Sequence, residues 1–187
     1  MHTNFPFLTE VIIKNCPQLE MFSDGGLPST LKILHLCGCS ALFMGSLQWA
    51  LGINTSLECL FIGKVDLESF PDQGFLPLSL THLYIFSCLN LKNLDYNGLC
   101  HSSLEELHLV DCPNVQCLPV EGLPKSISKL QIRDCLRLEE QCKKPNGEDW
   151  GKISQIQEVT NYGPSYDVVH WLISARLFCA HNLICNY

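Results

Sequence analysis

The sequence has little charge, few basic residues and no long apolar run. Of its 187 residues, 17% are charged, and 19 acidic residues outnumber 12 lysines and arginines, for a formal net charge of -7. Nucleic-acid binding draws on clustered basic residues, so this balance argues against a nucleic-acid partner. No window reaches the roughly 18 apolar residues that would cross a bilayer, so we expect no membrane span.

A secretory signal is also missing. The first residues, MHTNFPFLTEVIIKNCP, contain no basic segment, and Pro6, Thr9 and Glu10 interrupt their apolar stretch. Twelve cysteines would fit a secreted disulfide scaffold. Without a signal we interpret them as reduced thiols, and we expect a cytoplasmic or nuclear protein.

What the sequence does contain is a repeat. Its clearest copy lies within Ser103–Pro124 and follows the pattern L-x-x-L-x-L-x-x-C-x-x-V-x-x-L-P before a Gly-Leu-Pro turn. Six copies begin at Leu8, Leu31, Leu57, Leu80, Leu104 and Ile127, at intervals of 23, 26, 23, 24 and 23 residues. This spacing is typical of leucine-rich repeats, whose period is about 20–29 residues.

The repeat predicts its own architecture. In the L-x-L segment apolar and polar positions alternate, which predicts a short strand. Such strands bury their inner faces only by stacking, so successive copies should form a parallel ladder with a continuous core. Proline and glycine in the connecting segments discourage long helices. We therefore predict an α/β solenoid: a leucine-rich-repeat arc with short parallel concave strands and a mostly irregular or 3₁₀ convex side.

The repeats occupy only part of the chain. About six of them fill residues 1–142, and the polar segment 143–160 is predicted to cap the last one, with Trp150 sealing the core. Residues 161–187 form an atypical tail that matches nothing upstream. Two interpretations of the tail stay open, a helix with one apolar face and a disordered terminus.

Cysteine has a fixed place in the repeat. Five copies carry it, and Val65 replaces it in the third. A small residue in register with a hydrophobic period is best explained by burial. We therefore predict a buried column formed by Cys16, Cys39, Cys88, Cys112 and Cys135.

Two groups of residues could indicate chemistry. His35, Cys37 and Cys39 are closely spaced, but His35 and Cys37 should point outward whereas Cys39 points into the core, so they cannot converge on zinc. Cys59 and His82 could form a thiol–imidazole pair, but no third group to orient the histidine is evident. We therefore expect no metal, no cofactor and no enzymatic activity. The alternative from a different functional class is a small enzyme with a cysteine nucleophile.

One pattern favours a binding surface. The residue between the two strand leucines should point to the concave face, and in chain order these residues are Ile12, His35, Phe61, Tyr84, His108 and Gln131. His82 and Phe86 flank Tyr84 on that face. Exposed aromatic residues on a regular ladder are typical of protein interfaces. The predicted partner-binding residues are His35, Phe61, His82, Tyr84, Phe86 and His108.

Parts of the sequence resemble a known family. Ser103–Pro124 and Ser29–Leu42 resemble the C-terminal leucine-rich repeats of plant nucleotide-binding, leucine-rich-repeat disease-resistance proteins. The segment CKKPNGEDWGKISQI at Cys142–Ile156 is similar to the C-x-x-x-x-G-x-D-W-x-K-I ending of their coiled-coil class. The resemblance covers roughly residues 5–160. It implies an intracellular immune receptor whose repeats sense a pathogen effector or a modified host protein, and also contact the receptor's own nucleotide-binding domain.

The chain departs from that family in two respects. No G-x-x-x-x-G-K-[ST] motif is present, because Gly63-Lys64 and Gly151-Lys152 lack the upstream glycine and the following hydroxyl residue. The family's ADP or ATP site is therefore expected in a nucleotide-binding domain outside this chain. The tail also looks foreign to the family, so we interpret the chain as a truncated member or a partial gene model.

An alternative function stays open. Some substrate adaptors of ubiquitin ligases also use cysteine-bearing leucine-rich repeats. Those adaptors usually have regular helices on the convex side, and the Gly-Leu-Pro connections here argue against such helices.

Overall fold

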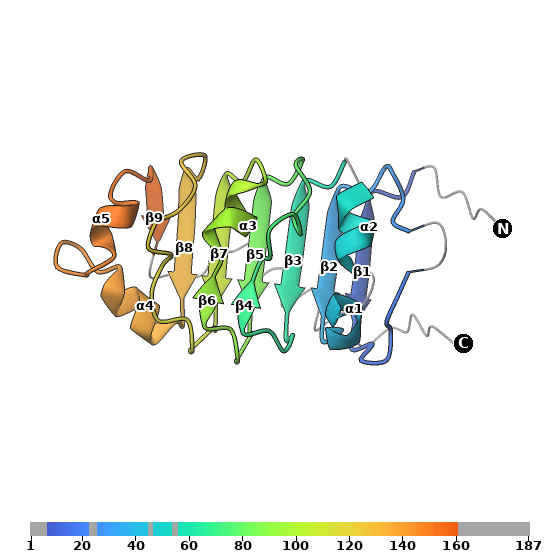
Figure 1. The fold of residues 1–187 in the computed structure, drawn as a ribbon, viewed down its shortest axis with the longest axis horizontal. Helices are drawn as coiled ribbons and strands as arrows, with labels where there is room; N and C mark the ends of the chain where they lie inside the picture. Colours follow the sequence, from blue (N-terminus) through green and yellow to red (C-terminus); the bar gives the residue numbers. More distant parts are fainter. Residues whose placement is uncertain (1–6, 23–25, 45–46, 54–55, 161–187) are drawn as a thin grey trace.

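A computed structural model describes residues 7–22, 26–44, 47–53 and 56–160 (Figure 1). The tail at 161–187, for which the sequence left a helix or disorder open, lies outside the described residues. Among the described residues, no helix is long and apolar enough to cross a membrane.

The described chain is built on one large parallel sheet. Its seven strands lie in chain order, β1-β2-β3-β5-β7-β8-β9, and every neighbouring pair is parallel. The strands are β1 (Glu10–Lys14), β2 (Ile33–Cys37), β3 (Cys59–Gly63), β5 (His82–Phe86), β7 (Glu106–Val110), β8 (Lys129–Arg133) and β9 (Glu158–Thr160). The short parallel strands predicted from the L-x-L segments are therefore present, and the whole has an α/β fold with repeating units.

Each pairing joins equivalent positions of successive copies. Val11 pairs with Leu34, and Leu34 in turn pairs with Leu60. The same column continues through Leu83, Leu107, Leu130 and Val159. Because side chains alternate between the two faces of a strand, this register stacks all the strand leucines on one face. They belong to a single hydrophobic core, in which the leucines of the inner strands are fully buried.

Short elements cover that leucine face. Figure 1 shows α1 (Ser40–Met44), α2 (Leu47–Ile53), α3 (Tyr96–Cys100) and a two-stranded parallel sheet of β4 (Ser69–Phe70) and β6 (Asn93–Leu94) in front of the large sheet. The helices α4 (Leu136–Gln141) and α5 (Trp150–Ile153) lie at the end of the sheet next to β8 and β9. The connecting segments are mostly turns and irregular chain, as predicted, but the described residues contain no 3₁₀-helix and their few helices are short α-helices. One reason is local capping: the Asp95 side chain accepts the Gly98 N–H at 2.8 Å and satisfies a donor at the start of α3.

The cysteine position marks a sharp turn after each strand. The residue before it has a left-handed backbone in all six copies, with φ between 51° and 66°: Asn15, Gly38, Lys64, Ser87, Asp111 and Asp134. The N–H groups of the first five donate to the last carbonyl of the next strand, at 2.8–3.1 Å. This conformation lets the chain turn into the core while its backbone stays hydrogen-bonded to the neighbouring copy.

The predicted cysteine column is confirmed for four of its five members. Cys39, Cys88, Cys112 and Cys135 are buried, whereas Cys16, in the first copy, is half-buried. Several of the thiols also bond to nearby backbone, as where the Cys135 thiol donates to the Arg133 carbonyl at 3.3 Å. All ten cysteines in the described part of the chain are free thiols.

The segment after the last copy closes one end of the core. Strand β9 pairs with β8, and Ile153 of α5 is fully buried. Trp150, which the sequence suggested as the seal, is half-buried and packs against the core edge. Gly147 has no room for a side chain, because a Cβ there would lie 2.1 Å from the Gln141 carbonyl oxygen. The chain therefore passes tightly over the end of α4 before it enters α5.

Candidate functional site

The candidate site is the face of the large sheet opposite the helices, which we call the back face. It corresponds to the concave face predicted from the sequence. In the five-residue strands the first, third and fifth residues face it, and the in-phase register aligns these positions in three columns across the sheet. The middle column contains the residues predicted between the strand leucines, namely Ile12, His35, Phe61, Tyr84, His108 and Gln131.

The four rings of this column form one continuous stack. Ring centroids are 4.2 Å apart between His35 and Phe61, 4.2 Å between Phe61 and Tyr84, and 4.3 Å between Tyr84 and His108. The interplanar angles are 12°, 10° and 25°. Neighbouring strands are about 4.8 Å apart, so equivalent rings on a parallel ladder meet face to face. We call His35, Phe61, Tyr84 and His108 the ring stack.

Stacking corrects the prediction that this row is exposed. His35 and His108 are each 2% exposed, Tyr84 is 8% exposed and Phe86 is 3% exposed. Each ring covers the face of the next, so little of these side chains is left to solvent. Phe61 and His82 are half-buried, and Ile12 is 51% exposed. The structure thus brings the six predicted residues onto one face but leaves four of them nearly enclosed.

Phe86 belongs to a second column, which is apolar at its centre. It packs with Cys37, Val110 and Phe61. A Cβ on Gly63 would lie 2.0 Å from Cε2 of Phe86, so the absence of a side chain at Gly63 makes room for the ring. Cys37, which the sequence suggested as an exposed thiol, is buried in this cluster, and burial raises the pKa of its thiol.

A polar network closes each end of the ring stack. At one end His35 Nε2 lies 2.9 Å from Glu10 Oε1. Burial lowers the pKa of His35 to about 4, and the positive charge of Lys14 contributes to this shift. At the other end both ring nitrogens of His108 face oxygens, with Nδ1 2.8 Å from Gln131 Oε1 and Nε2 3.1 Å from Glu106 Oε2.

Glu106 is the centre of a charged cluster that the sequence reading missed. Its carboxylate lies 3.6 Å from His82 Nε2 and 3.5 Å from Lys129 Nζ, in addition to His108. Burial acts to raise the pKa of Glu106, but the hydrogen bond from His108 and the charges of Lys129 and His82 outweigh it and lower the pKa. Glu106 is therefore a carboxylate at neutral pH. Its signal in the sequence is that Glu106 and Lys129 occupy the same strand position in successive copies.

The pair of Cys59 and His82 is a neighbouring pair in the sheet, because the two residues are register partners on β3 and β5. Burial raises the pKa of Cys59 to about 12, and the charges of Glu106, Glu10 and Glu58 add to it. His82 Nδ1 lies 2.7 Å from Thr81 Oγ1. Cys59 is therefore protonated at neutral pH, a poor state for a nucleophile. Within the described ranges, no three His, Cys, Asp or Glu side chains are grouped as metal ligands.

Two proteins of Arabidopsis thaliana are similar to this chain. The putative disease resistance protein At3g14460 is 35% identical over an alignment of 162 residues, and the match covers 72% of this chain and 11% of that protein. Protein SUPPRESSOR OF npr1-1, CONSTITUTIVE 1 is 31% identical over 112 residues, 60% of this chain and 7% of that protein. The chain thus spans only a small part of the length of these curated relatives. No family model and no solved structure matches it.

Proposed function

We propose that this chain is the leucine-rich-repeat recognition module of an intracellular plant immune receptor of the coiled-coil, nucleotide-binding class. In this role its back face binds a pathogen effector or a host protein that an effector modifies. The observation that carries the proposal is the in-register parallel sheet. Each copy of the sequence repeat contributes one of its first six strands, namely β1, β2, β3, β5, β7 and β8. Similarity to a putative disease resistance protein over 72% of the chain supports the defence role.

The C-terminal segment gives separate support. The residues that resemble the ending of the coiled-coil class each contribute to closing the core. Cys142 and Ile153 are fully buried, Gly147 fits under the Gln141 carbonyl, and the buried Asp149 accepts the Leu118 N–H at 2.7 Å. Because these residues cover the end of the core, we expect the same C-x-x-x-x-G-x-D-W-x-K-I motif in other leucine-rich-repeat proteins whose last repeat is capped by the same segment.

The back face suits binding better than chemistry. Its rings come from four adjacent strands, so the sheet fixes their positions. The ring side chains therefore lose little conformational entropy when a partner binds. Charged groups that are partly exposed surround the rings, which is how interfaces with an apolar centre and a polar rim are built. In this proposal the chain needs no cofactor of its own and catalyses no reaction, and it acts in the cytoplasm or nucleus beside the receptor's nucleotide-binding domain.

A leaf cell-death assay tests the proposal. A full-length receptor carrying this chain is co-expressed with a panel of secreted pathogen proteins, and cell death is scored. We expect at least one protein to trigger a response that Ile12→Ala with His82→Ala reduces. Both side chains are accessible on the back face, Ile12 at 51% and His82 at 37% exposed. Asp72→Ala, an exposed change on a connecting segment of the helix side, is the control and should have no effect. A silent back-face pair together with a disabling Asp72→Ala would contradict the proposal.

A further inference from the structure

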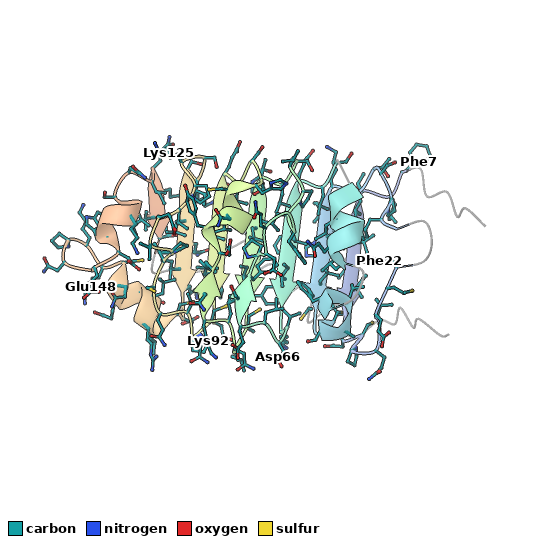
Figure 2. All side chains as sticks on the ribbon, in the orientation of Figure 1. Phe7, Phe22, Asp66, Lys92, Lys125 and Glu148 are labelled. Atoms are coloured by element: carbon teal, nitrogen blue, oxygen red, sulfur yellow. The ribbon has the colours of Figure 1, made fainter. Side chains whose placement is uncertain are left out.

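Charge is distributed unevenly between the two edges of the large sheet. Figure 1 shows the strands of the large sheet running in one direction, so that all seven begin at the same edge of that sheet. Figure 2 shows Lys125 at that edge and Asp66 and Lys92 at the opposite one. The two edges can therefore be compared residue by residue.

The edge where the strands begin is acidic. The first residue of each of the seven strands and the residue before it include five carboxylates and two ammonium groups, a formal charge of -3. The carboxylates are Glu10, Glu58, Glu105, Glu106 and Glu158, and the ammonium groups are Lys32 and Lys129. We call these seven residues the acidic edge. At the other edge, the last residue of β1, β2, β3, β5, β7 and β8 and the residue after it include three bases and two acids, a formal charge of +1. The starting positions of these same six strands have a formal charge of -2, because Glu158 belongs to β9.

Most of the negative charge at the acidic edge is accessible. Lys129 is engaged by Glu106, and Lys32 by Glu58. Glu10, Glu105 and Glu158 are exposed, and among the described residues no ion pair joins Glu105 or Glu158 to a lysine or arginine. Burial is the main cause of the raised pKa of Cys59 on the back face, and the negative charges of Glu106, Glu10 and Glu58 add to it.

Apolar side chains lie next to the acidic edge on the back face. Ile33 and Phe61 are half-buried, and Ile12 is the most exposed member of the middle column. Phe61, the half-buried member of the ring stack, turns its ring edge to a partner, because His35 and Tyr84 cover its two faces. Ring edges carry the positive side of the aromatic quadrupole and do not attract cations. A partner's basic groups would therefore gather at the carboxylates, and its apolar groups at the rings.

We propose that the partner of the back face presents a basic segment, with lysine or arginine side chains along the acidic edge and apolar side chains against Ile12, Ile33 and Phe61. The negative charge of the acidic edge favours a partner with basic side chains, and Ile12, Ile33 and Phe61 beside that edge favour apolar side chains in the same partner segment. The inference rests on the proposed function, since it names the kind of protein segment that the recognition face takes.

A peptide selection tests the charge preference. The full chain is used to select binders from a random library of displayed peptides. We expect the selected peptides to be enriched in lysine and arginine together with aromatic or aliphatic residues, and their binding to weaken as salt is added. Glu58→Lys with Glu105→Lys should lower their affinity about tenfold or more.

The matched control is Asp72→Lys with Glu121→Lys. It changes the net charge by the same amount at exposed positions on the helix side, and it should leave affinity unchanged. If the control lowers affinity as much as the edge variant, the basic segment does not bind at the acidic edge and the inference is wrong.

The remaining outcomes separate this inference from the proposed function. Peptides that lose affinity on Ile12→Ala with His82→Ala, but show no basic enrichment and tolerate the edge variant, would overturn the charge preference and leave the back face as the binding surface. A selection that yields no peptide sensitive to any back-face substitution would overturn both.

Discussion

Asp149 joins the C-terminal segment to the fifth copy by accepting the backbone N–H of Leu118 at 2.7 Å, across 31 residues of sequence. Asp149 is 4% exposed. Lys152 completes the connection, with its Nζ 2.6 Å from Asp149 Oδ1 and 3.2 Å from the Leu118 carbonyl oxygen. A buried carboxylate is thus balanced by one cation and one backbone donor, and both peptide groups of Leu118 are satisfied.

Removing this carboxylate should destabilise the chain. Asp149→Ala leaves a buried N–H without an acceptor and Lys152 without its partner, a loss of about 2–4 kcal/mol. Asp149→Asn keeps an acceptor oxygen and should cost less. Urea unfolding followed by circular dichroism measures both. The neighbouring exposed Glu148→Ala is the control and should change the unfolding free energy by less than about 0.5 kcal/mol. Equal effects of Asp149→Ala and Glu148→Ala would show that Asp149 does not hold the segment in place.

Gly63 should not tolerate a side chain. A Cβ there would lie 2.0 Å from Cε2 and 2.2 Å from Cζ of Phe86, so Gly63→Ala must displace the ring, at a cost of about 1–3 kcal/mol. Gly151→Ala is the matched control, because nothing lies within 4 Å of its Cβ position. Alanine there should be neutral or stabilising by up to about 1 kcal/mol. In a Phe86→Leu background the cost of Gly63→Ala should shrink, and an unchanged cost would place the strain elsewhere.

The repeat made the strands and the register predictable, because each column of the core is one repeat position. The left-handed residue before the cysteine also has a sequence signal. Asn15, Gly38, Asp111 and Asp134 are types that adopt this conformation more readily than most. Ser87 and Lys64 are the exceptions, and Lys64 lies in the copy that also lacks the cysteine. This left-handed position was not predicted, because the repeat was defined from its apolar residues and the polar residue before the cysteine was not compared between copies.

Other features depend on distances that the repeat pattern does not express. Alternation shows that Tyr84 points to the back face, but its burial follows from the spacing to Phe61 and His108 on the adjacent strands. That spacing could have been used, since equivalent rings in successive copies must meet at about the strand separation. The contact of Asp149 with Leu118 had no such signal, because it joins a repeat to a segment outside the repeat.

His35 should make the stability depend on pH. Its pKa is about 4 in the folded chain, because burial disfavours the charged ring and Lys14 adds repulsion. Glu10 lies 2.9 Å from Nε2 and favours the charged ring, but it is half exposed and its effect is screened. The unfolded chain, with the ordinary pKa of about 6.5, binds more protons between these two values. Stability is therefore fully present above pH 6.5 and is lost as the pH falls toward 4, by at most about 3 kcal/mol.

The variant His35→Phe isolates this contribution. It retains a ring in the stack but cannot take up a proton, so its unfolding free energy should fall less than that of the original chain between pH 6.5 and 4. Unfolding in urea at a series of pH values gives the comparison. Parallel pH profiles for the two chains would mean that folding does not lower the pKa of His35.

The ring stack should couple the stability contributions of its members. Tyr84 is stacked on both faces, so Tyr84→Ala should cost about 3 kcal/mol or more, whereas Tyr84→Phe keeps the ring and should cost less than about 1 kcal/mol. Combining Tyr84→Ala with Phe61→Ala should cost less than the sum of the single changes, by about 0.5–1.5 kcal/mol, because their shared contact is lost only once. Val120 is 88% exposed, so Val120→Ala paired with Tyr84→Ala should be additive. Additive costs for Phe61→Ala and Tyr84→Ala, or an unchanged melting temperature in Tyr84→Ala, would contradict the stack. If the stack does stabilise the fold, a loss of partner binding on truncating these rings would reflect lost stability as well as lost contacts.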